Sequence, residues 1–329
     1  MSQSGEKIPH RSSKCINCLE AEPNSEEHVF ADGAGGFLTA FILCRDCNGK
    51  FGNNIDSPYL RQPAIELARN AYRIGGRRNI IPQPLSGPYY VQGPIGQSVV
   101  KLDIDFKPRL IPQVEDILVR DDGAIQTTMV IDAEDRHKIP TVVRSKLERF
   151  FRSPTGTALG WTKEEQENAI EFAINEYMKS PDLETPVGVL AGSITGHLGT
   201  MFLELAKVAF EIAAIEDGDQ FIESLEAETI RKLLNQVKLG QIESLESFQD
   251  MLEAFRATPL SCDSQLFQVI QALTKGKAYE NHVAMLTGRH VVVSMFGDAY
   301  IFVNLRPEGC RGAIYINGAT NGSVDYLQL

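Results

Sequence analysis

The 329-residue sequence contains no long hydrophobic run. Its longest apolar stretches, residues 208–215 and 290–296, are far shorter than the roughly 20 residues that span a membrane. The first ten residues are polar and lack the apolar segment of a signal peptide. We therefore expect a cytoplasmic protein that does not associate with membranes, and a reducing environment in which disulfides do not form.

The chain after residue 90 is also poor in recognisable motifs. Residues 90–329 contain no phosphate-binding loop, no dinucleotide-binding glycine pattern, no nucleophilic serine elbow and no internal repeat. The composition, with 43% hydrophobic and 23% charged residues, is that of a globular protein. The length exceeds that of a usual single domain, so the sequence predicts at least two folding units.

Acidic residues outnumber basic ones, which gives a net charge of -11 and argues against a surface that attracts nucleic acid everywhere. The imbalance is uneven along the chain. Residues 1–80 contain ten Lys and Arg against nine Asp and Glu, so the whole negative excess lies in the remainder. Residues 61–78 hold five arginines and one glutamate. Any anionic ligand is expected to bind in this N-terminal part.

Cysteine is scarce, but its placement is the most informative feature of the sequence. Four of the six cysteines form two Cys-x-x-Cys pairs separated by 25 residues: Cys15, Cys18, Cys44 and Cys47. Two such pairs provide the four thiolates of a tetrahedral zinc site. Redox-active thiols or a labile disulfide pair are the alternative, although neither pair lies in a thioredoxin-like context. We expect structural zinc that holds residues 14–56 together.

Further residues between and after these pairs carry a family resemblance. Glu27-His28-Val29 and Gly35-Gly36 lie between the pairs, and Asn48 directly follows the last cysteine. This combination resembles the zinc-knuckle branch of the HNH (ββα-metal) endonucleases over about 45 residues, to Asp56. Each piece alone is weak, but the combination is specific.

The resemblance implies a hydrolytic site for phosphodiester bonds of DNA. His28 would act as the general base that activates water, a role that suits an imidazole at neutral pH. Glu27 and Asn48 would bind a catalytic divalent cation, Mg²⁺ or Mn²⁺. Because successive side chains of a strand point to opposite sides, Glu27 and His28 can share one site only if the hairpin bends or bulges there. A link to prokaryotic defence effectors, which join an HNH head to a second module, also follows from the resemblance.

The sequence departs from the family pattern in one place that concerns the base. Thr39 stands where many HNH proteins have an asparagine that orients the catalytic histidine. Either Thr39 takes over this role or a backbone carbonyl orients His28. The alternative function is a catalytically silent zinc module that binds nucleic acid or protein.

A basic helix is expected after Ser57-Pro58. Its apolar positions recur at helical spacing, and Arg69, Arg73 and Arg77 follow at steps of four residues, so they would line one face and contact the phosphate backbone. A merely solvated face is the alternative. Prolines and glycines then interrupt regular structure over residues 76–96.

The predicted fold class is α+β. We expect a zinc-stapled ββα-metal module with its basic helix (1–75), a Pro/Gly-rich linker (76–96), and a larger α+β domain (97–329) with central helices and a closing β-meander. Its clearest elements are a helix capped by Thr162 and Glu165, a buried helix over 197–215, and four C-terminal strands at 282–286, 290–295, 300–305 and 312–316. Further helices are expected over 225–239 and 242–256. This domain is expected to sense a ligand, bind a regulatory partner or shape the substrate groove.

Overall fold

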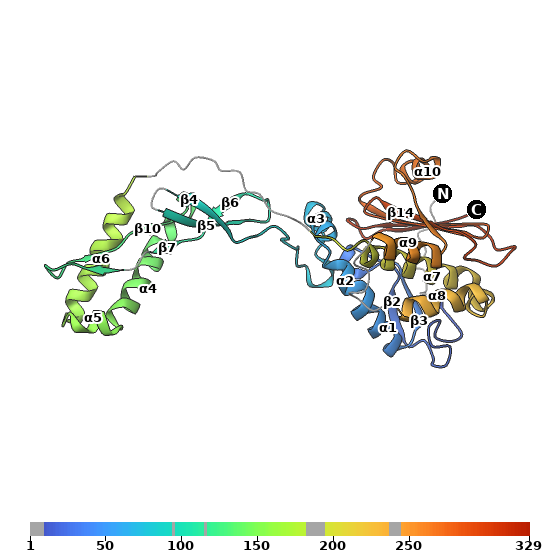
Figure 1. Cartoon of the computed structure of the whole chain (residues 1–329), viewed down its shortest axis with the longest axis horizontal. Coiled ribbons are helices and arrows are strands. Elements are labelled where there is room, and N and C mark those ends of the chain that lie inside the picture. Colours follow the sequence, from blue (N-terminus) through green and yellow to red (C-terminus); the bar gives the residue numbers. More distant parts are fainter. Residues whose placement is uncertain (1–9, 94–95, 115–116, 182–194, 237–244) are drawn as a thin grey trace. The chain divides into compact units, whose positions relative to one another are not determined.

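The computed structural model describes residues 10–93, 96–114, 117–181, 195–236 and 245–329, and Figure 1 shows a mixed α+β architecture. The chain forms two compact units. The first combines Met1–Pro84 with Ile194–Leu329, and the second comprises Leu85–Ser193. Among the described residues, no helix has the length and apolar character needed to cross a bilayer.

The N-terminal module of the first unit consists of a small sheet followed by helices. Strand β2 (Ser25–His28) pairs antiparallel with β3 (Thr39–Leu43), and β1 (His10–Arg11) pairs parallel with the other edge of β3. The chain then enters α1 (Arg45–Phe51), a π-helical turn η2 (Gly52–Asp56) and the short α2 (Ser57–Leu60). The order of β2, β3 and α1 is therefore strand, strand, helix.

The basic helix is shorter than the sequence predicts. Pro63 begins a separate helix, α3 (Pro63–Ala71), and the helix closes with a Schellman motif. Arg73 adopts a left-handed φ of 57°, and the N–H of Ile74 donates to the carbonyl of Arg69 at 2.8 Å. Arg77 follows in a 3-10 turn, η3 (Gly76–Arg78). The prediction that Arg69, Arg73 and Arg77 line one helix face is wrong, because the helix ends before Arg73.

A long buried helix, α7 (Leu198–Ile222), forms the centre of the first unit. The sequence predicted a buried helix here, and the structure confirms it: the helix packs on β3, η2 and α2 and also on the C-terminal sheet. Figure 1 shows α7 between the N-terminal module and that sheet. One continuous hydrophobic core joins all three. Helices α8 (Leu225–Gln236) and α9 (Leu245–Ala254) follow, and residues 237–244, part of the helices predicted over 225–239 and 242–256, lie outside the described residues.

The C-terminal sheet differs in topology from the predicted meander. Its antiparallel strands lie in the order β11-β14-β13-β12-β15-β16, so β15 pairs with β12 and not with β14. Strands β12 to β15 thus have the 4-1-2-3 order of a Greek key, which the long connection between β14 and β15 permits. The bounds are β11 (Ala257–Pro259), β12 (Asn281–Thr287), β13 (His290–Met295), β14 (Asp298–Phe302), β15 (Ala313–Gly318) and β16 (Val324–Gln328), with α10 (Gln265–Leu273) between β11 and β12.

The second unit has its own hydrophobic core. Helices α4 (Ile139–Phe151) and α6 (Lys163–Lys179) pack together, and Thr162 and Glu165 form the predicted capping box of α6. The remaining elements are short: β4 (Tyr89–Gly93), β5 (Gly96–Leu102), β6 (Pro108–Leu110), β7 (Gln113–Val114), β8 (Leu118–Val119), β9 (Ile125–Gln126), β10 (Met129–Val130), η4 (Ala133–Lys138) and α5 (Pro154–Ala158).

The division into units differs from the predicted domains. Residues 10–75 do not fold around a core of their own, because their apolar side chains share one core with α7 and the C-terminal sheet. The chain leaves this unit at residue 84, inside the Pro/Gly-rich segment, and re-enters it at residue 194. Residues 97–329 therefore belong to two units.

Candidate metal centre and active site

The four paired cysteines come together in the first unit. Their sulfur atoms all lie within 4.8 Å of one another, and the sulfurs of Cys18 and Cys44 are 4.0 Å apart. A tetrahedral ZnS₄ centre with 2.3 Å bonds requires sulfur separations of about 3.8 Å. Three of the four side chains are buried. These residues therefore fit one metal ion such as zinc.

The surroundings act differently on the four thiols, because burial raises the pKa of Cys15 and raises that of Cys47 to about 12. Burial alone raises the pKa of Cys18, but hydrogen bonds from the backbone of Ala21 and Glu20 outweigh this and lower the pKa to about 7. Such donors around the sulfurs are typical of metal-bound thiolates. The donors at Cys18 fit a metal-bound thiolate, whereas a bound cation would have to lower the pKa of the Cys15 and Cys47 thiols.

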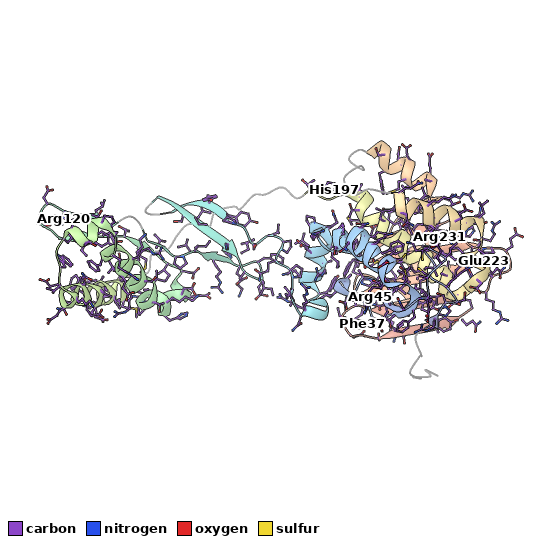
Figure 2. All side chains as sticks on the ribbon, turned by 90° about the horizontal axis from the view of Figure 1, so that it is seen from below. Phe37, Arg45, Arg120, His197, Glu223 and Arg231 are labelled. Atoms are coloured by element: carbon purple, nitrogen blue, oxygen red, sulfur yellow. The ribbon has the colours of Figure 1, made fainter. Side chains whose placement is uncertain are left out.

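The first cysteine pair is held by α8. The guanidinium of Arg231 donates to the carbonyl of Ile16, between the two cysteines, at 2.9 Å. Asn17 and Asn235 exchange side-chain hydrogen bonds, and Lys14 pairs with Glu223 at 2.8 Å. Figure 2 shows the labelled Arg231 and Glu223 on the same compact unit as Arg45 of α1. The metal centre is therefore built into the larger unit.

His28 lies at the end of β2, half-buried, opposite Thr39 of β3. Its Nδ1 atom is 3.0 Å from the carbonyl oxygen of Gly36. A carbonyl oxygen only accepts hydrogen bonds, so Nδ1 must donate. In the neutral ring the lone pair is then on Nε2. Of the two predicted ways to orient His28, the structure uses the backbone carbonyl.

Glu27 does not share a face with His28. The strand register shifts between Ser25 and Glu27, but Glu27 and His28 face successive partners, Ala40 and Thr39, so their side chains alternate. The Glu27 side chain is 3% exposed and its Oε1 lies 2.7 Å from Nζ of Lys207 on α7. The prediction required a bulge between Glu27 and His28. The irregularity instead precedes Glu27, so it does not bring both side chains to one site.

Lys207 is the centre of a buried charge cluster. Its ammonium also lies 3.0 Å from Asp56 and 3.9 Å from Glu211, and it donates to the carbonyl of His28 at 3.3 Å. Burial lowers the pKa of Lys207, but the surrounding carboxylates outweigh this and hold the pKa well above its usual value. Lys207 is therefore a permanent cation beside the Glu27-His28 dipeptide.

The carboxyl groups around this single cation are in excess. Burial raises the pKa of Glu204 and of Glu211 well above the usual value, and neighbouring carboxylates add to the shift. The carboxylate of Glu204 accepts from the backbone N–H of Ala31 at 3.2 Å, and the nearby charge of Asp56 contributes to its raised pKa. Sequence analysis missed this cluster as a partner of Glu27, although three charged residues within an otherwise apolar helix were visible.

Asn48 lies on α1, as its place after Cys47 implies. Its Nδ2 donates to the carbonyl of Glu26 at 3.0 Å and so ties α1 to β2. The predicted pair of ligands for Mg²⁺ or Mn²⁺ does not fit this arrangement, because the carboxylate of Glu27 is already engaged by an ammonium group.

The arginines of the basic segment have different environments. Arg69 is half-buried on α3, its Nε atom is enclosed, and burial lowers its pKa. Arg73 is exposed beyond the end of the helix. The side chain of Arg77 lies outside the described part. Arg73 is thus the arginine of this set that the structure presents to solvent.

The comparisons with known proteins give no family assignment: no protein-family model, no curated protein and no solved structure matches this chain.

Proposed function

We propose that the chain is a zinc-stapled nuclease that hydrolyses phosphodiester bonds of DNA, with His28 as general base. The observation that carries this proposal is the hydrogen bond between Nδ1 of His28 and the carbonyl of Gly36. It supports the tautomer that a general base needs. The HNH resemblance of residues 15–56, with the order strand, strand, helix and cysteines that fit a structural zinc, supports the substrate class.

In this proposal Nε2 of His28 takes a proton from water while the water oxygen attacks phosphorus. The bond to the 3′-oxygen breaks, and the leaving oxygen takes the bonding electron pair and a proton from solvent. The Gly36 carbonyl stabilises the imidazolium that forms, because Nδ1–H donates more strongly when the ring is charged. Arg73 is the proposed contact to the phosphate backbone.

One observation favours the second candidate, a silent module that binds nucleic acid or protein without cutting. HNH-type cleavage by analogy uses the acidic residue next to the histidine, and here that residue, Glu27, is buried against Lys207. A module in this state would keep its zinc and its basic surface and lack hydrolytic activity.

Supercoiled plasmid separates the two candidates. The zinc-loaded full chain is incubated with plasmid, alone and with added Mg²⁺ or Mn²⁺, beside His28→Ala and His137→Ala. His137 is a matched control, because its Nδ1 also faces a backbone carbonyl, that of Glu134, but it lies exposed in the second unit.

Nicked or linear plasmid that disappears in His28→Ala and persists in His137→Ala supports the nuclease. Plasmid that is shifted on a gel and stays intact supports the binding module. Cleavage that survives His28→Ala contradicts the assigned base. Cleavage that requires added Mg²⁺ or Mn²⁺ would mean that residues other than Glu27 and Asn48 bind the cation.

A further inference from the structure

The loop between β2 and β3 is held by the C-terminal sheet. Asn317 of β15 is fully buried, and its Oδ1 accepts from the backbone N–H of Phe37 at 2.7 Å and of Leu38 at 3.2 Å. Its Nδ2 donates to the carbonyl of Gly35 at 2.8 Å. One amide side chain thus binds the backbone on both sides of Gly36, from a position about 280 residues away in the sequence.

Two further contacts restrict the same loop. Nε2 of His282, on β12 beside β15, lies 2.8 Å from the carbonyl of Ala34. Gly35 has a φ of 84°, and a Cβ atom there would lie 2.4 Å from the carbonyl oxygen of Ala319. Gly36 is equally confined, since a Cβ would lie 1.8 Å from the carbonyl oxygen of Phe30. Gly35 lets the loop backbone approach the residue that follows β15, and Gly36 lets the two sides of the loop approach each other.

The braced segment includes the atom that orients His28. The Gly36 carbonyl, which accepts from Nδ1 of His28, lies between the Gly35 carbonyl and the Phe37 N–H that Asn317 binds. Because peptide groups are planar, fixing the peptides before and after Gly36 restricts the direction of its carbonyl. The route from the sheet to the imidazole is therefore Asn317, the loop backbone, and His28.

We propose that Asn317 is a positioning residue for His28: it sets the direction of the Gly36 carbonyl and thereby keeps the proton of the neutral ring on Nδ1. This inference deepens the proposed function and rests on it for its catalytic consequence. Its structural part, the tautomer of His28, does not depend on any activity. The C-terminal sheet thus belongs to the construction of the site.

The amide of Asn317 is suited to this task, whereas a carboxylate or an aliphatic side chain at the same position is not. The site needs an acceptor for two N–H groups and a donor for one carbonyl, which an asparagine side chain supplies at once. A carboxylate supplies the acceptor alone and faces the Gly35 carbonyl with a second oxygen. An aliphatic side chain leaves all three backbone groups unpaired in a buried place.

The test records ¹⁵N spectra of the histidine rings in the zinc-loaded full chain, which report the tautomer of His28. The spectra compare the wild type with Asn317→Ala, Asn317→Asp and the control Asn281→Ala. Asn281 lies on the adjacent strand β12, and its amide donates to the carbonyl of Lys277. Cleavage of plasmid is measured on the same samples, with zinc content and thermal unfolding as checks of folding.

We expect the wild type and Asn281→Ala to carry the proton on Nδ1 and both Asn317 variants to shift it toward Nε2. The cleavage rate of the Asn317 variants should fall by about 10²-fold, since misplacement by about 1 Å has effects of that size. If the wild type carries the proton on Nε2, or if a folded Asn317 variant keeps the wild-type tautomer, the inference is wrong.

The two proposals fail in different ways. If the wild-type chain does not cut DNA but the Asn317 variants lose the Nδ1 tautomer, the nuclease is refuted and the positioning role is retained. If the wild-type chain cuts DNA, and folded Asn317 variants cut at the same rate with unchanged ring spectra, the positioning role is refuted and the nuclease is retained. If Asn317→Ala does not fold, Asn317→Asp and the wild-type spectrum still decide the inference.

Discussion

Lys207 Nζ lies 2.7 Å from Glu27 Oε1 in a pair that is almost completely shielded from solvent. The two residues are 180 positions apart, one on the central helix and one on the hairpin between the two cysteine pairs. Their contact replaces the metal contact that the family resemblance implies for Glu27. It adds a buried charge pair to the hydrophobic core that joins the hairpin to α7.

Substitution of Lys207 by Met should destabilise the first unit strongly. The change leaves the buried Glu27 and the half-buried Asp56 without their cation, and loss of one partner of a buried pair costs about 3–5 kcal/mol. The free energy of unfolding by urea measures this. Lys232→Met is the matched control, because Lys232 also pairs with a glutamate, Glu228, but on an exposed helix face.

We expect Lys232→Met to leave the urea midpoint unchanged. Lys207→Met that unfolds at the wild-type urea concentration would show that the ammonium does not stabilise the carboxylates. The double variant Lys207→Met/Glu27→Gln adds a further check. It should recover part of the loss, because one of the stranded carboxylates becomes neutral.

The clustering of the four cysteines and the local elements could be predicted from sequence because their signals are local. The paired spacing of Cys15 to Cys47 and the capping box before α6 depend on residues a few positions apart, and both appear in the structure as expected. The sequence left two candidates for the group that orients His28, which were Thr39 and a backbone carbonyl. The loop conformation, which no local pattern specifies, decided between them.

The rest of the site depends on contacts between distant segments. Nothing near Glu27 in the sequence predicts that Lys207 will meet it, and nothing near Gly36 predicts Asn317. The order of the C-terminal strands was missed for the same reason, because the pairing of β15 with β12 is set by packing and not by turn residues. The apolar residues of α7 predicted its burial correctly, but nothing in the sequence identified the partners of its charged residues.

Glu211→Gln should make stability less dependent on pH above about pH 5. Burial raises the pKa of Glu211 in the folded chain, so the folded state holds a proton that the unfolded state releases from about pH 4.5 upward. The stability that this proton contributes is present at lower pH and is lost as pH rises toward the folded pKa, by about 1.4 kcal/mol per pH unit.

Urea unfolding of the wild type and Glu211→Gln at pH 5 to 8 measures the effect. The difference between the two should move in favour of the variant as pH rises. Glu228→Gln is the control, because Lys232 lowers the pKa of this exposed carboxyl and no proton is held there. Parallel curves for wild type and Glu211→Gln would contradict the assignment.

His282→Gln should protect the fold against acid. Burial lowers the pKa of His282 to about 4, so the folded state rejects a proton that the unfolded state binds below about pH 6.5. Stability from this source is therefore full above pH 6.5 and falls as pH decreases to about 4, by roughly 3 kcal/mol in total. The slope of the unfolding free energy between pH 6.5 and 4 should be smaller in His282→Gln. His137→Gln, exposed in the second unit, should retain the wild-type slope.

Cys47→Ser should abolish metal binding by the full chain. Four thiolates close the tetrahedral shell, and a hydroxyl in place of a buried sulfur is a poor ligand for zinc. Metal analysis of the purified chain should give about one zinc per wild-type molecule and far less in the variant. Cys262→Ser is the matched control, because this exposed cysteine lies outside the cluster, and it should retain the metal.

Because the cluster packs on α8 and shares the core of α7, loss of zinc should also lower the urea midpoint of the first unit. Zinc retained at the wild-type level in Cys47→Ser would mean that the ion is held elsewhere.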